Sequence, residues 1–300
     1  MAETTHQHLR KFQEANKDKG RLLICCPDQP GIVAAVSNFL FQNGANIMES
    51  SQYTTDAYEG TFFLRIEFDC PGLLGKEEEM KSKFQAVAEN FNMQWDMKFV
   101  YQLKRTAIFV SKQLHCLREL LWEWQSGDLV TDIAVVVSNH EDARDLVESV
   151  GIPFHYIPAN KDIRQEAEAK QLELLEDYKI DQIVLARYMQ ILTPDFVAAY
   201  PSQIINIHHS FLPAFIGANP YGRAYERGVK LIGATSHYVT NDLDEGPIIE
   251  QDIMRVDHRD NAEDLKKIGR KVERSVLARG VKWDLEDRIL VHQNKTIVFN

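Results

Sequence analysis

The sequence predicts an α/β protein built from two domains, and three observations support this prediction. The chain has 300 residues, which fits two domains of roughly 100–200 residues better than one. Residues 20–101 show the order strand, helix, strand, strand, helix, strand, which is typical of a ferredoxin-like fold. From Arg105 onward, buried strands alternate with helices, a pattern that predicts a Rossmann-like, mostly parallel sheet.

The first predicted domain follows a polar leader. Residues 1–19 carry many charges and no apolar run, so we expect this leader to be flexible. In the domain itself, apolar runs bounded by turn residues predict strands, and apolar residues at helical spacing predict helices. The expected elements are strands at Leu22–Cys26, Asn46–Tyr53, Thr61–Asp69 and Met93–Tyr101, and helices at Gly31–Phe41 and Lys76–Asn90.

A short linker at residues 102–104 precedes the second domain, which we expect over residues 105–300. Its strands are almost wholly apolar, as are strands in the middle of a parallel sheet. Ligands of such sheets bind outside the carboxyl ends of the strands, so functional residues are expected there. The expected strands are Thr106–Val110, Asp132–Ser138, Phe154–Tyr156, Gln182–Ala186, Ile204–Ile207, Leu231–Val239 and Ile248–Val256, and the expected helices are His115–Ser126, 143–149, Lys161–Tyr178, Pro194–Ala199 and Ala262–Ala278.

Composition excludes several classes of protein. With 44 acidic and 34 basic residues the chain carries a net charge of −10, which argues against binding nucleic acid through bulk charge. No apolar run approaches the roughly 20 residues that span a bilayer, and the N-terminus has no secretory signal pattern. The four cysteines lack CxxC spacing, so we expect a reducing, cytoplasmic location.

Metal-binding and nucleotide-binding motifs are missing from the sequence. It contains neither HExxH nor the Cys/His spacing of zinc sites. The glycine-rich motifs of nucleotide-binding loops, GxGxxG and GxxxxGK[ST], are also missing. His115 and Cys116 are adjacent, but neighbouring residues on a helix do not face each other, so Cys116 is expected in the core. We therefore expect no metal site and no prosthetic group.

Two polar residues at the end of one predicted strand form the strongest candidate site. Asn206 and His208 are two residues apart, and the alternation of a strand places both side chains on one face. An amide N–H can donate to a developing oxyanion, and a histidine beside it can accept or donate a proton. The alternative is a polar pair that only ends the strand and binds loop carbonyls.

An acidic loop follows a later predicted strand. It runs from Thr240 to Gly246 and contains Asp242, Asp244 and Glu245. A carboxylate beside an imidazole orients the ring and can hold an attacking water. Only one of the three acids needs to be functional, and an exposed acidic turn would explain any of them equally well.

These segments resemble the enzymes that transfer formyl groups from 10-formyltetrahydrofolate. The matching motifs are Asn206-Ile-His208 with the following Ser210-x-Leu-Pro213, the segment 243–249 and the segment 185–192. They occur in the family's order, and the resemblance covers about two-thirds of the chain. It implies that Asn206, His208 and Asp244 act on the formyl carbonyl. The folate-binding residues that it implies are Tyr188, Met189, Gln190, Ile191 and Leu192.

The first domain resembles the ACT module. The segment 26–33 opens the first helix and the segment 43–47 follows it, as in that module. Such modules commonly bind small amino acids and pair with one another. The resemblance therefore implies an effector site at Asp28, Gly31 and Asn46, and a homo-oligomer that is either a dimer or a tetramer. The alternative is a module that only pairs the chains.

One departure from the transferases favours water as the formyl acceptor. Glycinamide ribonucleotide transferases hold the phosphate of their second substrate in a glycine-rich loop, and the corresponding Ser111–Cys116 has no glycine. We therefore expect hydrolysis of 10-formyltetrahydrofolate to tetrahydrofolate and formate, in one-carbon and purine metabolism. The alternatives are a formyltransferase acting on an amine and a sensor that binds folate without catalysis.

The resemblance leaves open which residue takes the proton of the attacking water and which cations bind the folate tail. The proton of the attacking water can pass to Asp244 directly or through His208. The anionic glutamate tail of a folate needs cations, and Arg187, Arg223 and Arg227 are candidates that could equally be surface charges.

Overall fold

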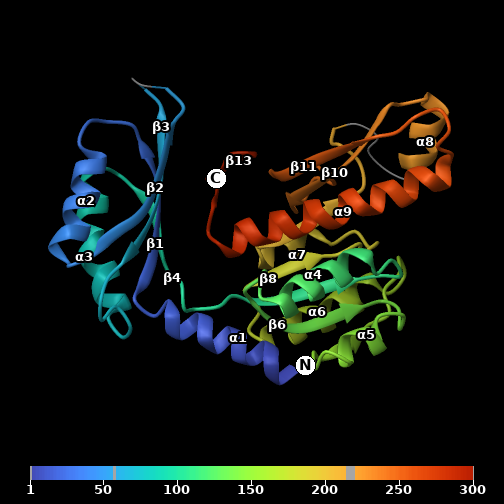
Figure 1. Ribbon diagram of the computed structural model, residues 1–300, viewed down its shortest axis with the longest axis horizontal. Coiled ribbons are helices and arrows are strands. Elements are labelled where there is room, and N and C mark those ends of the chain that lie inside the picture. Colours follow the sequence, from blue (N-terminus) through green and yellow to red (C-terminus); the bar gives the residue numbers. More distant parts are fainter. Residues whose placement is uncertain (1, 57–58, 214–219, 300) are drawn as a thin grey trace. The chain divides into compact units, whose positions relative to one another are not determined.

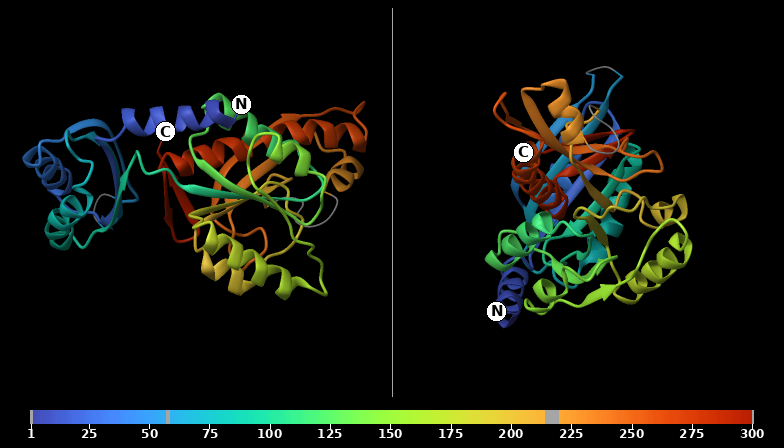
Figure 2. Two further views of the ribbon diagram at one scale, coloured as in Figure 1. Left: turned by 90° about the horizontal axis from the view of Figure 1, so that it is seen from below. Right: turned by 90° about the vertical axis from the view of Figure 1, so that its right-hand side faces the viewer.

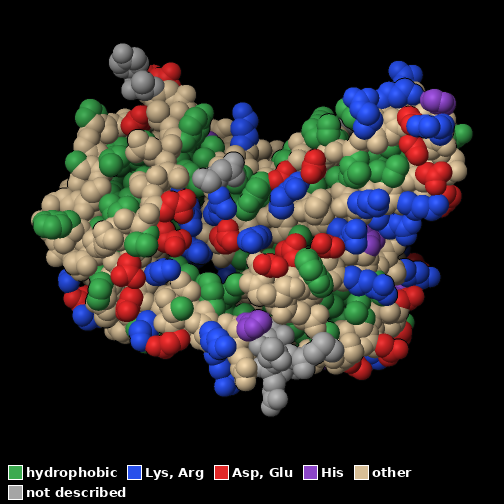
Figure 3. Space-filling model, in the orientation of Figure 1, with side chains coloured by type: hydrophobic (Ala, Val, Ile, Leu, Met, Phe, Trp, Pro, Cys, Tyr) green, Lys and Arg blue, Asp and Glu red, His purple; other side chains and the backbone are tan. Residues whose placement is uncertain are grey.

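The computed structural model describes residues 2–56, 59–213 and 220–299, which form two compact units (Figures 1, 2 and 3). Most of the first unit is residues 7–103, and most of the second is residues 104–285. The chain changes unit inside the linker segment 102–104. Among the described residues, no helix is long and apolar enough to cross a membrane.

The first unit contains a four-stranded antiparallel sheet with two helices on one face (Figure 1). The strand order is β2-β3-β1-β4. Leu22 and Ile24 of β1 are fully buried under these helices, where the rings of Phe39 and Phe84 meet with centroids 5.0 Å apart. The elements are β1 (Lys19–Pro27), α2 (Ile32–Gln42), β2 (Asn46–Thr54), β3 (Thr61–Asp69), α3 (Glu77–Asn90) and β4 (Gln94–Phe99). The predicted order of strands and helices is confirmed.

The N-terminal leader is helical, contrary to the flexible segment expected over residues 1–19. Helix α1 spans Ala2–Ala15, and β1 begins at Lys19. Good helix formers such as Ala, Gln, Glu and Lys dominate this segment, and no glycine or proline interrupts it before Gly20. Near its end, the Gln13 side chain donates to the carbonyl oxygen of Tyr101 at 3.0 Å.

A C-terminal segment belongs to the first unit, whereas we expected the whole of residues 105–300 in the second. Residues 286–292 and 297–299 group with the first unit. Arg65, only 2% exposed, donates to the carbonyl oxygens of Asp287 at 3.0 Å and Glu286 at 3.1 Å. This segment carries β12 (Ile289–His292), which pairs with β13 (Lys295–Val298). Contacts of charged groups so far apart in the chain leave no periodic signal in the sequence.

The second unit is built on a seven-stranded sheet of order β11-β10-β9-β8-β5-β6-β7, with helices on both faces (Figure 2). Its strands from β5 to β9 run parallel, and β10 is antiparallel to both of its neighbours. The strands are β5 (Arg105–Val110), β6 (Asp132–Ser138), β7 (Phe154–Tyr156), β8 (Gln182–Leu185), β9 (Ile204–His208), β10 (Leu231–Tyr238) and β11 (Ile248–Arg255). The helices are α4 (His115–Ser126), α5 (Arg144–Glu148), α6 (Arg164–Asp177), α7 (Pro194–Ala199), α8 (Pro220–Arg227) and α9 (Ala262–Leu285).

The order of the parallel strands reverses between β5 and β8. From β5 the chain builds β6 and β7 on one side, then returns to build β8 and β9 on the other. Open α/β sheets bind ligands at such a switch point, outside the carboxyl ends of the strands. The Rossmann-like, mostly parallel sheet expected from the sequence is confirmed, and its topology places the candidate site.

Candidate active site

The polar residues predicted at the end of one strand lie against the neighbouring antiparallel strand. Asn206 and His208 are in β9, and the register pairs Asn206 with His237 of β10. Asp244 follows in the loop between β10 and β11, with a φ of 59° that aspartate tolerates better than most residues. Two strands and one loop thus bring together residues that are far apart in sequence.

His237 fixes the orientation of Asn206. Its Nδ1 lies 2.9 Å from the carbonyl oxygen of Tyr238, so the ring donates there and leaves Nε2 as an acceptor. The Asn206 side-chain amide, 3.1 Å away, donates to that Nε2. Burial lowers the pKa of His237, which keeps the ring neutral and able to accept. The second N–H of this amide has no acceptor within residues 2–56, 59–213 and 220–299, and can donate to another molecule.

His208 and Asp244 form the second half of the group. The Nδ1 of His208 lies 3.2 Å from Oδ2 of Asp244, while Nε2 of His237 is 3.8 Å from the other carboxylate oxygen. Burial alone would raise the pKa of Asp244, but the hydrogen bond with His208 outweighs it and lowers the pKa overall. Asp244 is therefore ionised at neutral pH, whereas its neighbours Asp242 and Glu245 are exposed.

One nitrogen of this group has no partner in the part of the chain that the structure describes. His208 is 5% exposed, and its buried Nε2 makes no hydrogen bond to these residues. A buried polar atom without a partner is costly, and such atoms concentrate where a ligand or water completes the bonding. With Nδ1 held by the carboxylate, Nε2 is the atom of His208 able to take or give a proton at the site.

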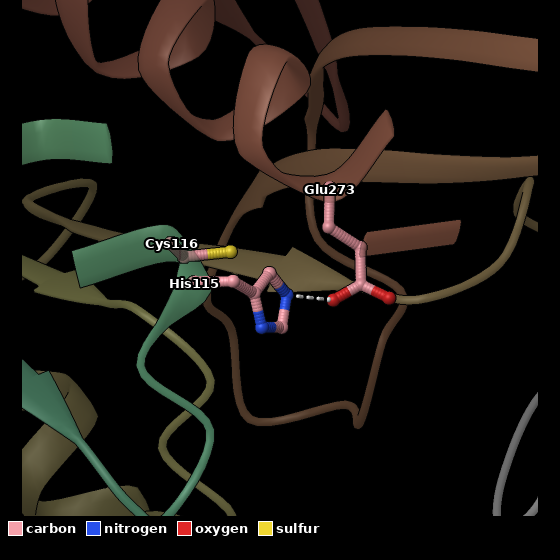
Figure 4. A group of neighbouring side chains, drawn as sticks. All are labelled: His115, Cys116 and Glu273. Atoms are coloured by element: carbon pink, nitrogen blue, oxygen red, sulfur yellow. Dashed lines mark hydrogen bonds and ion pairs between the residues drawn. The ribbon is translucent and has the colours of Figure 1, made fainter. Parts of the chain in front are cut away.

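A second buried polar cluster includes His115, which begins the helix that follows β5, and Glu273 (Figure 4). Glu273 of α9 accepts from His115 Nε2 at 2.7 Å and from the Tyr221 hydroxyl at 2.5 Å. Arg187 Nε lies 3.5 Å from the same carboxylate. Burial would raise the pKa of Glu273, but these partners outweigh it and lower the pKa to about 2. Glu273 is thus a buried anion with a partner on each oxygen.

His115, Cys116 and Glu273 could offer three metal-ligand atoms within 4.8 Å of one another. The donor set does not suit a cation, because the Glu273 carboxylate is already bonded to His115 and Tyr221 and lies beside Arg187. Burial also raises the pKa of the Cys116 thiol well above its ordinary value, which disfavours the thiolate that binds metals. We interpret the group as an internal ion-pair cluster.

The predicted folate-binding segment divides into buried and exposed residues. Tyr188 is buried, and its hydroxyl accepts a hydrogen bond from Gln171 at 2.9 Å. Met189 and Ile191 are more than half exposed, which is unusual for apolar side chains and suits contact with a ligand. Gln190 and Leu192 are partly buried. The segment follows β8, whose Leu185 pairs with Asn206, so it begins beside the Asn206–His208 group.

The candidate tail-binding arginines differ in position. Arg187 is 6% exposed and paired with Glu273, so it is engaged inside the protein and is not a surface cation. Arg223 is partly buried in α8, and Arg227 is exposed at the end of the same helix. The sequence prediction missed the roles of His115, Tyr221, His237 and Glu273, because these depend on strand register and helix packing.

The predicted effector residues of the first unit do not all lie together. Asp28 and Gly31 are in the loop between β1 and α2, where Asp28 accepts a hydrogen bond from the Thr54 hydroxyl at 2.8 Å. Gly31 has a φ of 97°, which favours glycine. Asn46 starts β2 opposite Asp69, at the other end of the sheet from Thr54. Because neighbouring strands are antiparallel, the structure separates Asn46 from Asp28 and Gly31.

Family models match both units of the chain. A model described as an ACT domain matches residues 20–84, and one described as formyl transferase matches residues 104–281. The second match covers more than half of the chain.

Similar proteins and structures give consistent results. The chain is 72% identical over 294 residues to a formyltetrahydrofolate deformylase of Bacillus subtilis, covering 98% of both chains. It resembles the crystal structure of a formyltetrahydrofolate deformylase from Pseudomonas syringae with a TM-score of 0.91 and 47% identity, over 98% and 99% of the two chains. A phosphoribosylglycinamide formyltransferase from Anaplasma phagocytophilum matches with a TM-score of 0.60 and 33% identity, over 66% of this chain and 96% of that one.

Proposed function

The chain belongs to the formyl transferase family and, within it, to the formyltetrahydrofolate deformylases, and we propose that it hydrolyses 10-formyltetrahydrofolate with water as the acceptor. The products are tetrahydrofolate and formate. The observation that carries the proposal is the buried Nε2 of His208, which has no hydrogen bond to the described residues, on a ring whose Nδ1 lies 3.2 Å from an ionised Asp244. Asn206, two residues away in β9, supplies an amide N–H donor.

The first step is attack by water on the formyl carbon. His208 Nε2 takes the proton of the water, and Asp244 stabilises the imidazolium through Nδ1. The new C–O bond gives a tetrahedral intermediate whose negative oxygen accepts the second N–H of Asn206. His237 holds that amide in place, so no reorientation is needed as the charge develops.

The second step is collapse of the intermediate. The imidazolium of His208 gives its proton to N10 of the folate while the C–N bond breaks and the carbonyl re-forms. Tetrahydrofolate and formic acid result, and the acid loses its proton to solvent as formate. His208 thus returns to its neutral form without any other acid or base, which matches its single unpartnered nitrogen.

We propose that the apolar side chains of the segment 188–192 contact the folate rings. Met189 and Ile191 are exposed beside the site, as is Leu243 next to Asp244. The Met189 backbone N–H donates to Ser111 at 3.0 Å and anchors the segment to the end of β5. No prosthetic group takes part in this mechanism.

The test is release of formate from 10-formyltetrahydrofolate when no amine is present. We expect steady turnover from the parent protein and from Asp242→Asn, which alters an exposed acid in the same loop as a matched control. If formate appears only after an amine is added, the protein is a transferase and the proposal is wrong.

For the ACT domain we propose a small amino acid as effector, bound at the end of the sheet that holds Asp28 and Gly31. The edge strands β2 and β4 offer unpaired backbone groups, so we also propose pairing of ACT domains in a homo-oligomer. We propose a cytoplasmic location, where the four free thiols stay reduced. Calorimetry with a panel of amino acids tests the effector site, and an absence of heat with all of them would contradict it.

A further inference from the structure

The crevice at the switch point of the large sheet is filled by the protein's own side chains. Doubly wound sheets bind ligands outside the carboxyl ends of the strands at which the order reverses, here β5 and β8. Ser111 follows β5 and Arg187 follows β8, and the Ser111 backbone N–H donates to the Arg187 carbonyl oxygen at 3.3 Å. The two strand ends are thus joined directly to each other.

Three helices complete the filling. His115 comes from the first turn of α4, Tyr221 from α8 and Glu273 from α9, and both His115 and Tyr221 bond to the Glu273 carboxylate. Figure 4 shows the bond between His115 and Glu273. Glu273 is 1% exposed and Tyr221 is 7% exposed, so little of either side chain is open to solvent. We call His115, Arg187, Tyr221 and Glu273 the switch-point cluster.

A glycine in α9 makes room for this arrangement. A Cβ atom at Gly269 would lie 2.0 Å from the hydroxyl oxygen of Tyr221, closer than atoms can approach. Gly269 therefore lets the Tyr221 ring lie against α9, one turn of the helix from Glu273. Glycine inside a helix is destabilising relative to alanine, so its presence here indicates a specific need for close packing.

The switch-point cluster adjoins the reacting group through one intervening ring. His209 follows His208, with ring centroids 5.2 Å apart, and its own centroid is 5.9 Å from that of Tyr221. Burial and the charge of Arg187 lower the pKa of His209 to about 3, so this ring is neutral and adds no charge between the two groups. A molecule entering from this side would have to displace these rings.

We propose that the switch-point cluster determines the choice of acceptor, because it occupies the place that a second substrate would take beside the formyl group. Both oxygens of the Glu273 carboxylate are bonded within the cluster and Arg187 lies beside them, so this carboxylate has no oxygen left for an amine-bearing molecule. Water, which needs no such place, is left as the acceptor. This inference rests on the proposed hydrolysis and names the residues that restrict the reaction to it.

The test opens the cluster and measures where the formyl group goes. His115→Ala removes the member at the solvent edge, whose side chain is 13% exposed, and the double variant His115→Ala/Tyr221→Ala opens more space. Each is incubated with 10-formyltetrahydrofolate and glycinamide, and formate and N-formylglycinamide are both quantified. The matched control is His155→Ala, which removes a partly buried histidine of β7 whose ring is bonded to the Tyr178 hydroxyl.

The expected result is a shift in the product ratio. The parent and His155→Ala give formate alone, whereas the opened variants form N-formylglycinamide in proportion to the amine, with formate falling by the same amount. Relief of a steric block changes discrimination by about 10–100-fold, so the ratio should rise by this factor from His115→Ala to the double variant. A folded, hydrolysing double variant that forms no N-formylglycinamide would overturn the inference.

A second measurement needs no variant. Formate release by the parent should be unchanged by high glycinamide, because no place for the amine exists. Competitive inhibition, or formation of N-formylglycinamide by the parent, would show an accessible acceptor site and overturn the inference. The proposed hydrolysis is judged separately, from formate release without amine, so the two can fail independently.

Discussion

Two buried polar groups occupy the carboxyl edge of the same sheet, and they differ in how their hydrogen bonds are completed. In the Asn206–His208–Asp244 group, Nε2 of His208 is buried without a partner among the described residues. In the switch-point cluster, both oxygens of Glu273 accept hydrogen bonds from other side chains. The first group can still form a hydrogen bond with an external molecule, whereas the Glu273 carboxylate forms its hydrogen bonds within the protein.

This difference shows why burial and charge alone do not identify a reactive site. Glu273 is the more deeply buried carboxylate, and each of its oxygens already accepts a hydrogen bond, so neither oxygen is left to act on a substrate. Asp244 acts through His208, whose second nitrogen remains available. The comparison predicts that the first group controls turnover and the second controls stability and acceptor choice.

The largest effect is expected from Asp244→Asn. The amide removes the charge that holds the His208 ring and stabilises its protonated form, and a comparable change in a serine protease triad lowers turnover by about 10⁴-fold. Folate binding should persist, because the apolar contacts are unaffected. Turnover is measured by formate release and binding by fluorescence titration. A variant with near-parent turnover would contradict the assigned role.

Asn206→Ala should be the next most severe. Loss of one oxyanion donor typically lowers turnover by about 10²–10³-fold. The effect should appear in kcat and not in KM, since the bond forms as the charge develops. His237→Asn, which removes only the ring that orients the amide, should lower kcat less. Equal losses in the two variants would indicate that His237 does more than position Asn206.

Glu273→Ala tests the second cluster through stability. Removing the carboxylate leaves Arg187 buried without its ion-pair partner, and breaking a buried pair in this way costs about 3–5 kcal/mol. The midpoint of urea unfolding should be lower for Glu273→Ala than for the parent, whereas the midpoint for Asp242→Asn should be unchanged. An unchanged midpoint for Glu273→Ala would mean that the ion pairs contribute little.

The smallest effect is the loss of folding stability at acid pH that is due to His209. Its pKa falls from 6.5 to about 3 on folding, so below pH 6.5 the unfolded chain binds a proton that the folded chain does not. Stability contributed by the neutral ring is present above pH 6.5 and is lost as the pH falls towards 3. Between pH 6.5 and 5 this amounts to on the order of 1 kcal/mol. His209→Phe should flatten the decrease, and an identical pH profile would rule out the effect.

Much of the fold follows from local sequence patterns. The alternation in Thr61–Asp69 and the apolar run Asp132–Ser138 mark strands correctly, because each pattern reports which faces of a strand are buried. The segments that differed are α1, whose polar composition resembled a flexible leader, and residues 286–292, which join the first unit through Arg65. Neither the contact of α1 with Tyr101 nor that of residues 286–292 with Arg65 has a periodic signature in the sequence.

The site is only partly visible in the sequence. Asn206 and His208 share a face by strand alternation, so their proximity was predictable. Asp244 was one of three acids in its loop, and only the family resemblance distinguished it; in the structure Asp244 lies beside His208, while the other two are exposed. His237 and Glu273 need the register of β9 with β10 and the packing of α9, which a single sequence does not contain.

The central claim, that water is the formyl acceptor, is tested most directly by hydrolysis in water enriched in ¹⁸O. The parent protein and 10-formyltetrahydrofolate are incubated without any amine, and the formate is analysed by mass spectrometry. We predict one labelled oxygen per formate released, in amounts equal to the tetrahydrofolate formed. Formate without the label, or no formate until an amine is supplied, would contradict the account.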